Sequence, residues 1–229
     1  MIKLENVSYS IENEKILKNI NIEIKKGDYI SIVGLNGSGK SQLALLLAGV
    51  ISNYEGNYFY NNELVKSNYI LGKKCGIVFQ RPENQFVSSI VKNDIAFGLE
   101  NLNISQQKME GKINKILEKL NILKLKEKNV NNLSGGERQL VALASILIMD
   151  FDFYIFDEIT SMLDEKYFKI VFSIIKKLKE EGKTIIYITH NLKEIRFAEK
   201  VFIMKDNTII ESLNKEQLTN DILKKYQLI

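Results

Sequence analysis

The residues best suited to chemistry lie at positions 34–41, GLNGSGKS, which fit the phosphate-binding pattern G-x-x-x-x-G-K-[ST]. Glycines in such a loop let backbone N–H groups turn towards phosphate oxygens. Lys40 would place a positive charge beside the β- and γ-phosphates, and Ser41 would offer a hydroxyl to Mg²⁺. The alternative is a glycine-rich turn that binds nothing. The predicted nucleotide contacts of this loop are Gly34, Asn36, Gly37, Ser38, Gly39, Lys40 and Ser41.

Two acids, Asp157 and Glu158, directly follow the apolar run FYIF. A buried strand there would deliver both carboxylates to the edge of a sheet, beside the phosphate loop. Asp157 could then hold Mg²⁺, directly or through water, and Glu158 could accept a proton from an attacking water. The alternative is a strand that simply ends in exposed acids. His190, the one histidine of the chain, follows another apolar run and is predicted at the same edge as a γ-phosphate contact.

A second segment with anion-binding character is LSGGE at positions 133–137. Ser134 can cap the helix that follows, and Gly135 and Gly136 allow close approach to the backbone. The N-terminus of that helix would attract phosphate, although a capped helix start without a ligand would look the same. Two phosphate-type segments in one chain predict that two chains meet head to tail, each covering the nucleotide of the other.

The elements that must position these residues follow from the spacing of apolar side chains. Residues 2–9 and 16–24 alternate apolar and polar residues, which predicts two antiparallel strands. Four shorter apolar runs predict buried strands and two longer patterns predict helices: strands at 29–33, 76–79, 153–156 and 184–189, helices at 42–50 and 166–181. Alternating strands and helices predict an α/β fold with a mostly parallel sheet and its ligand at the carboxyl ends of the strands.

Residues 88–127 differ in texture, with apolar residues at helical spacing and many Lys and Asn residues on the other face. We expect a single domain over residues 1–229, with an inserted helical subdomain at about 88–150 that includes LSGGE. A hairpin is predicted around residues 206–207, and the tail to residue 229 is predicted to be helical.

Composition narrows the class of protein. The 229 residues are 45% hydrophobic and carry a net charge of +4, from 32 Lys and Arg against 28 Asp and Glu. This slight basic excess does not indicate nucleic-acid binding. Cys75, the single cysteine, precludes an intrachain disulfide and is predicted in the core. The start of the chain lacks the pattern of a signal peptide, and no apolar run approaches the ~20 residues that span a bilayer.

The order of these motifs resembles that of the ATP-binding cassette (ABC) ATPases over essentially the whole chain: the phosphate loop, Gln80, LSGG, the two acids, SMLD at 161–164 and His190. The resemblance implies ATP hydrolysis between two cassettes, with Ser134, Gly135, Gly136 and Glu137 of one closing on the nucleotide of the other. It implies that Gln80 senses Mg²⁺ and the attacking water. The implied catalytic residues are Glu158, His190 and Gln80, and the implied Mg²⁺ ligands are Ser41, Gln80 and Asp157.

A narrower resemblance rests on FQRPENQFV at 79–87, NDIAFGLEN at 93–101 and DEITSMLD at 157–164. These segments are similar to the ATPase subunits of energy-coupling factor (ECF) importers of vitamins and metal ions. The resemblance implies that residues 80–97 form part of a groove for a coupling helix, with Phe86, Val87 and Phe97 as its apolar surface. A core position is the alternative for Phe97.

The ECF resemblance also implies three partners and a location. The partners are a second ATPase subunit, identical or related, a transmembrane coupling subunit and a substrate-binding membrane subunit, and no nucleic acid is expected. The chain would then lie at the cytoplasmic face of the cell membrane. Two alternatives remain open: the ATPase of another ABC transporter class, and a non-transport ABC ATPase. The latter typically carries long coiled-coil insertions or tandem cassettes, and this sequence contains neither. The transported substrate is not encoded here, because in this architecture a separate subunit selects it.

Several positions depart from the ABC pattern. The family usually places an aromatic residue against adenine two positions past Tyr9, and here that residue is Ile11, so Tyr9 or Ile11 is predicted to contact the base. The usual arginine of the signature helix is Leu140, while a basic side chain occurs at Arg138. None of these changes removes a predicted catalytic group.

Overall fold

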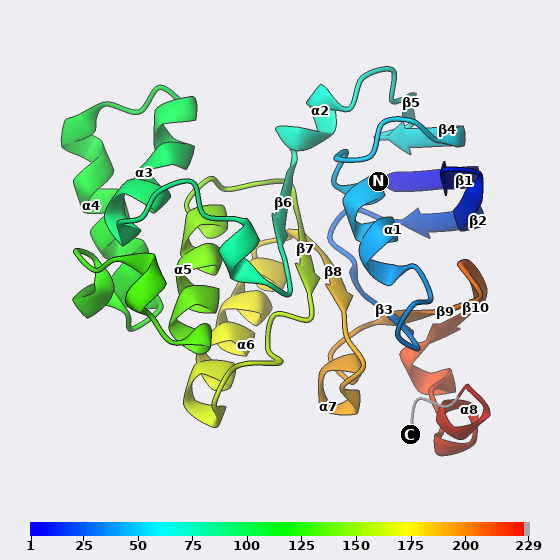
Figure 1. The fold of residues 1–229 in the computed structure, drawn as a ribbon. Helices are drawn as coiled ribbons and strands as arrows, with labels where there is room; N and C mark the ends of the chain where they lie inside the picture. The colour runs from blue at the N-terminus through cyan, green and yellow to red at the C-terminus, as the bar shows by residue number, and fades with distance from the viewer. Residues whose placement is uncertain (227–229) are drawn as a thin grey trace. The chain divides into compact units, whose positions relative to one another are not determined.

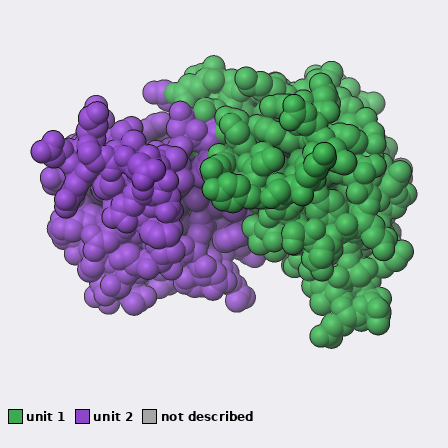
Figure 2. All heavy atoms as spheres, turned by 90° about the horizontal axis from the view of Figure 1, so that it is seen from above, with its two compact units in different colours: residues 1–75, 152–157, 178–229 green, residues 76–151, 158–177 purple. Residues whose placement is uncertain are grey.

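The computed structural model describes residues 1–226, except for the side chains of residues 192, 193 and 220. The chain forms two compact units (Figure 2). Unit 1 contains residues 1–75, 152–157 and the chain from residue 178 onward, and unit 2 contains residues 76–151 and 158–177. Among the described residues, no helix has the length and apolar character needed to cross a bilayer.

An antiparallel sheet occupies the N-terminal part of unit 1 (Figure 1). Its strands are β1 (Ile2–Ile11), β2 (Glu14–Ile24), β4 (Glu55–Tyr60) and β5 (Glu63–Leu64), in the order β2-β1-β4-β5. The two predicted antiparallel strands are confirmed as β1 and β2, and the turn between them places Glu12 and Asn13 at positive φ, the backbone that a tight hairpin turn requires. Most apolar residues of β1 and β2 are buried, as the period of two predicts, but register shifts interrupt the alternation in β1 and Ile11 is exposed.

The second sheet of unit 1 is mostly parallel. Its strands here are β3 (Tyr29–Gly34), β7 (Phe153–Asp157), β8 (Thr184–Ile188), β9 (Lys200–Lys205) and β10 (Thr208–Asn214), in the order β10-β9-β3-β8-β7. Only β10 runs antiparallel to its neighbour, in the predicted hairpin through residues 206–207. Every residue of β3, β7 and β8 is buried, which explains why these strands appear as continuous apolar runs. The predicted α/β fold is confirmed.

Four helices accompany these strands along the chain. They are α1 (Lys40–Leu47), α6 (Glu165–Glu180), α7 (Leu192–Ile195) and α8 (Asn220–Lys225), the last before the undescribed residues 227–229. Most of α6 belongs to unit 2. The predicted helices at 42–50 and 166–181 therefore exist, with ends that differ by one to three residues. The predicted helical tail is described as far as α8, and the rest of that prediction lies outside the described residues.

Unit 2 begins in β6 (Cys75–Val78) and is mainly helical. Short helices α2 (Tyr69–Gly72) and η1 (Pro82–Asn84) flank this strand, and α3 (Val91–Asn101), α4 (Gln106–Lys119) and α5 (Gly135–Leu147) follow, with α3 packed on α4 and α5. Burial raises the pKa of the Cys75 thiol well above its usual range, which agrees with its predicted core position. Helices α3, α4 and α5 fall within the interval 88–150, although the division into a core domain and an inserted subdomain stays a prediction.

Candidate nucleotide-binding site

The phosphate loop connects β3 to α1, and different physical constraints require glycine at its different positions. Gly34 has φ +156°, and a Cβ there would lie 2.2 Å from the carbonyl oxygen of Met204 and 2.8 Å from Oγ of Ser38. Gly37 and Gly39 adopt φ +81° and +93°, which side-chain-bearing residues rarely adopt. A Cβ on Gly37 would meet no atom within 4 Å. Close packing therefore requires glycine at 34, whereas backbone conformation requires it at 37.

Two buried side chains of the loop are arranged to meet an anion. The ammonium of Lys40 donates hydrogen bonds to the carbonyl oxygens of Gly34 (2.8 Å) and Leu35 (3.0 Å), which holds it above the loop. Oγ of Ser38 is buried, and among the described residues it has no hydrogen-bond partner. A buried hydroxyl without a partner is costly, and a phosphate oxygen would satisfy it. The loop therefore fits a phosphate group both by charge and by an unused donor.

The strand register gathers the other predicted residues of unit 1 at the same edge. Ile32 of β3 pairs with Ile188 of β8, and Ile188 pairs with Asp157 of β7. All three strands are parallel, so the phosphate loop, Asp157 and His190 leave the sheet at the same end. The Asp157 side chain is buried, whereas Ser41 and His190 are exposed.

Gln80 and Glu158, both in unit 2, are joined directly. Nε2 of Gln80 donates a hydrogen bond of 2.8 Å to Oε2 of Glu158. Glu158 adopts φ +48°, a left-handed conformation that raises the energy of a residue with a side chain by about 1–2 kcal/mol. Backbone strain of this kind clusters at functional sites, where the surrounding structure maintains it. The contact shows that the Gln80 amide orients the Glu158 carboxylate, a relation that the sequence motifs did not specify.

The signature segment begins α5 with a complete capping box. Oγ of Ser134 accepts a hydrogen bond from the backbone N–H of Glu137, whose carboxylate accepts one from the N–H of Ser134. The predicted cap is therefore confirmed. A Cβ on Gly136 would lie 3.3 Å from the carbonyl oxygen of Met162, so the first turn of α5 packs closely against the SMLD segment. Whether this turn binds a nucleotide held by a second chain stays a prediction.

The two candidates for the adenine contact lie on β1. Tyr9 is partly buried and pairs with Leu17, while Ile11 pairs with Glu14 at the hairpin and is 44% exposed. An exposed isoleucine next to a hairpin offers an apolar surface to a flat base. The choice between Tyr9 and Ile11 stays a prediction.

The donor set bears on how Mg²⁺ could be held. Among the described residues, no three His, Cys, Asp or Glu side chains lie close enough together to form a metal site by themselves. Mg²⁺ in nucleotide sites typically takes one or two protein ligands and completes its shell with phosphate oxygens and water. The buried carboxylate of Asp157 and the exposed hydroxyl of Ser41 fit such a site, in which the nucleotide brings the remaining ligands.

An apolar groove in unit 2 contains the residues predicted to contact a coupling helix. Its volume is about 210 Å³, and Val87 and Phe97 on its wall are 60% and 47% exposed. Phe97 is therefore not a core residue. Asp94 fixes the start of the groove, because its carboxylate accepts hydrogen bonds from the N–H of Val87 and the hydroxyl of Ser145. The lining residues are Gln85, Phe86, Val87, Asp94, Phe97, Gly98, Asn101, Ala142, Ser145, Ile146 and Met149.

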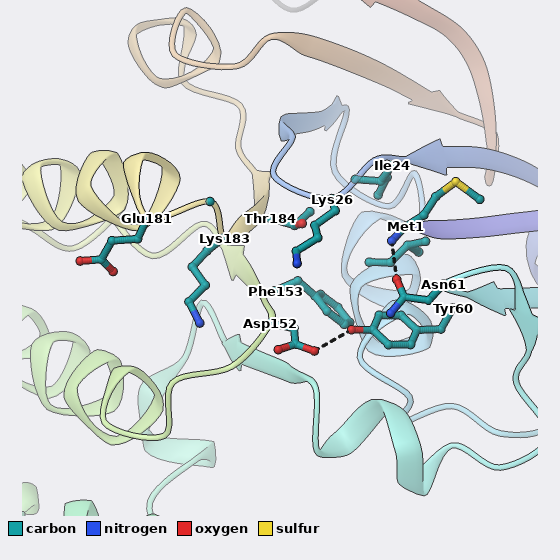
Figure 3. A pocket seen from close by; sticks show the side chains of 12 residues that line it. Met1, Ile24, Lys26, Tyr60, Asn61, Asp152, Phe153, Glu181, Lys183 and Thr184 are labelled. Atoms are coloured by element: carbon teal, nitrogen blue, oxygen red, sulfur yellow. Dashed lines mark hydrogen bonds between the residues drawn. The ribbon is translucent and has the colours of Figure 1, made fainter.

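A pocket of about 210 Å³ in unit 1 lies at the opposite ends of the strands (Figure 3). It opens beside Asp152, which precedes β7, and Thr184, which begins β8. Asp152 accepts a hydrogen bond from the hydroxyl of Tyr60 (2.8 Å) and pairs with Lys74 (3.2 Å). Burial alone would raise the pKa of Asp152, but these hydrogen bonds lower it overall. These contacts join β4 to β7, and the phosphate loop takes no part in the pocket.

Comparison with known proteins agrees with this geometry. Residues 17–161 match the family model described as ABC transporter. The chain is 43% identical to the energy-coupling factor transporter ATP-binding protein EcfA of Methanosarcina acetivorans, covering 99% of this chain and 84% of that protein. It is 41% identical to EcfA1 of Fusobacterium nucleatum, covering 96% and 85%.

Two solved structures extend the comparison to the fold. The structure of cbiO1 from Clostridium perfringens, part of the ABC transporter complex cbiONQ, has a TM-score of 0.82 at 30% identity, covering 99% of this chain and 94% of that one. A dimeric ATP-binding cassette, MJ0796 bound to ADP and Pi, has a TM-score of 0.85 at 28% identity, covering 94% and 99%.

Proposed function

Because the chain belongs to the ABC transporter family, we propose that it is the ATP-hydrolysing subunit of an ECF-type importer. It couples ATP binding and hydrolysis to the uptake of a vitamin or metal ion through separate membrane subunits. One observation carries the ATPase assignment: parallel pairing places the phosphate loop, Asp157 and His190 at one end of β3, β7 and β8. The similarity to EcfA proteins over almost the whole chain supports the transport class.

The phosphate loop would bind the ATP phosphates. Lys40 would exchange its two carbonyl acceptors for phosphate oxygens, and the buried Ser38 hydroxyl would gain the partner that it lacks among the described residues. Ser41 and Asp157 would hold Mg²⁺ together with phosphate oxygens, with Gln80 as the further ligand that family resemblance implies. The bound ion would neutralise phosphate charge.

Glu158 is the proposed general base. It follows Asp157 in the chain, its carboxylate accepts a hydrogen bond from the Gln80 amide, and this carboxylate would accept a proton from the attacking water. His190, exposed after β8, would donate a hydrogen bond to the γ-phosphate. Lys40 and His190 would then stabilise the charge that develops on the transferred phosphoryl group.

A second copy, or a related ATPase subunit, would complete the site. The capping box leaves further N–H groups of the first turn of α5 directed out of the helix, which suits a phosphate of the partner's nucleotide. The similarity to a cassette whose structure is described as dimeric and bound to ADP and Pi supports this arrangement.

The apolar groove of unit 2 is the proposed contact with a helix of the transmembrane coupling subunit. Its exposed apolar residues, Val87 and Phe97, suit the apolar face of an amphipathic helix. Binding there would hold the chain at the cytoplasmic face of the membrane.

Membrane fractionation with co-expressed membrane subunits tests the transport assignment. We expect the wild-type chain to sediment with membranes, and the double variant Val87→Asp, Phe97→Asp to remain in the supernatant. Leu123→Asp is the matched control, because Leu123 is also an exposed apolar residue of unit 2 but does not line the groove. Equal sedimentation of the double variant would contradict the groove assignment. A wild-type chain that never sediments would favour the non-transport alternative.

A further inference from the structure

The segment that carries His190 contains two buried polar side chains that the predicted motifs do not use. After β8 the chain passes through Thr189, His190 and Asn191 into α7. Thr189 and Glu194 are each only 2% exposed, whereas His190 between them is exposed. A carboxylate is rarely buried to this extent, because removing it from water is costly unless hydrogen bonds replace the lost hydration.

Hydrogen bonds join Thr189, Asn191 and Glu194, here called the turn cluster, around His190. The Thr189 hydroxyl donates to Oε2 of Glu194 in a short contact and accepts from the backbone N–H of Asn191 at 2.9 Å. Nδ2 of Asn191 donates to Oε1 of Glu194 at 3.3 Å. The N–H of Glu194 also donates to the carbonyl oxygen of Asn191 at 3.0 Å. The residues on both sides of His190 are therefore fixed by a single carboxylate.

The turn cluster is also anchored to the strand that leads into the phosphate loop. The N–H of Thr189 donates to the carbonyl oxygen of Ile32 in β3, at 3.3 Å. Burial, together with the charge of Glu194, raises the pKa of Tyr29 at the start of β3. The residue before His190 is thus hydrogen-bonded to β3, the strand that ends at Gly34.

We propose that Glu194 and Thr189 are positioning residues, which hold the backbone on either side of His190 so that its imidazole meets the γ-phosphate in one orientation. This inference rests on the proposed function of His190. His190 lies between Thr189 and Asn191, so the backbone that these two residues fix sets the position from which its imidazole projects. Neither side chain is expected to touch ATP.

The test is a double-mutant cycle on steady-state ATP hydrolysis by the full chain with Mg²⁺. Thr189→Val removes the hydroxyl at nearly constant volume, and Glu194→Ala removes the carboxylate. We expect each to lower kcat by about 10-fold, with the KM for ATP changed by less than about twofold, because positioning acts on the transition state. Thr189→Ser and Glu194→Gln keep hydrogen-bonding groups in place and should recover most of the activity.

The decisive measurement repeats these substitutions in a His190→Ala background. If the turn cluster acts through His190, Thr189→Val should add no further loss of kcat there, because the group that it positions is already gone. A full additional 10-fold loss in that background would overturn the positioning role. Thermal unfolding identifies any variant that fails to fold. If Glu194→Ala fails to fold, the comparison of Thr189→Val with Thr189→Ser still tests the positioning role.

Two outcomes separate this inference from the function on which it rests. If His190→Ala lowers kcat but Thr189→Val retains wild-type turnover, the positioning role is wrong and the role of His190 stands. If His190→Ala itself retains wild-type turnover, both the contact of His190 with the γ-phosphate and the positioning role are overturned.

Discussion

Glu158 combines a proposed catalytic function with a strained backbone, and the two properties can be measured separately. Its φ of +48° raises the energy of the folded state by about 1–2 kcal/mol for any residue with a Cβ. Glycine avoids this penalty, but it also gives the unfolded chain more freedom, which opposes the gain by about 0.4–1 kcal/mol. The Glu158→Gly variant should therefore unfold with a free energy about 1 kcal/mol higher than that of Glu158→Ala.

Three substitutions at this position separate the effect of backbone strain on stability from the effect of the carboxylate on turnover. Glu158→Ala and Glu158→Gly both lose the hydrogen bond from Gln80, and they differ in the backbone penalty of the folded state and in the freedom of the unfolded chain. Glu158→Gln keeps the shape and the strain and removes the charge, so its stability should stay close to that of the wild type. All three remove the proposed base, and we expect the turnover of ATP to fall by a factor on the order of 10² or more.

Thermal unfolding and steady-state ATP hydrolysis provide the two readouts. A difference of 1 kcal/mol corresponds to about 2–4 °C in Tm for a chain of this size. Lys169, exposed in α6, is the matched control position. There the glycine variant should be less stable than the alanine variant by about 1 kcal/mol, which is the opposite sign to position 158. If the glycine variant at 158 is no more stable than the alanine variant, the strain argument is refuted. Turnover near that of the wild type in Glu158→Gln would refute the base assignment.

Three further perturbations follow from the geometry. Gly34→Ala places a Cβ 2.2 Å from a backbone oxygen, so it should lower the unfolding free energy by about 3 kcal/mol or more and weaken ATP binding. Gly37→Ala should lower the unfolding free energy by only about 1 kcal/mol. Thermal unfolding measures the stability of both variants, and nucleotide titration measures their affinity for ATP. Asp152→Asn should lower Tm by at most about 2–4 °C at pH 7, because partial burial raises the pKa of the half-exposed Asp152 but its hydrogen bonds lower that pKa overall. This stabilisation is present above the unfolded pKa of about 3.9 and is lost as pH falls through the folded pKa. The Tm curves of wild type and variant, measured against pH, should therefore converge at low pH. Ser134→Ala removes the helix cap and should lower the free energy of unfolding by about 1 kcal/mol. Ser134→Asp should keep the cap but slow ATP hydrolysis, because its charge repels phosphate. Equal turnover in Ser134→Asp and wild type would contradict nucleotide binding at this turn.

Strands and helices were largely predictable because their signals are local. The period of two in β1 and β2 and the continuous apolar runs of β3, β7 and β8 reflect burial on one or both faces, which composition records directly. Helix ends were less certain, as at α1, where the helix begins at Lys40 inside the phosphate motif rather than after it. The groove at Phe97 was ambiguous in sequence, since helical spacing gives an aromatic residue the same pattern on a core face and on an exposed apolar surface.

The motif order by itself determined the family, the phosphate loop and the residue types of the candidate site, because glycine, lysine and paired acids at fixed spacing have few other uses. Only the tertiary structure decided which residues support them. The Gln80–Glu158 hydrogen bond joins residues 78 positions apart, and the turn cluster depends on the buried carboxylate of Glu194. Such contacts leave no local pattern, since any polar residue can stand at an exposed position, and only the folded chain shows which of them lost access to water and gained a partner.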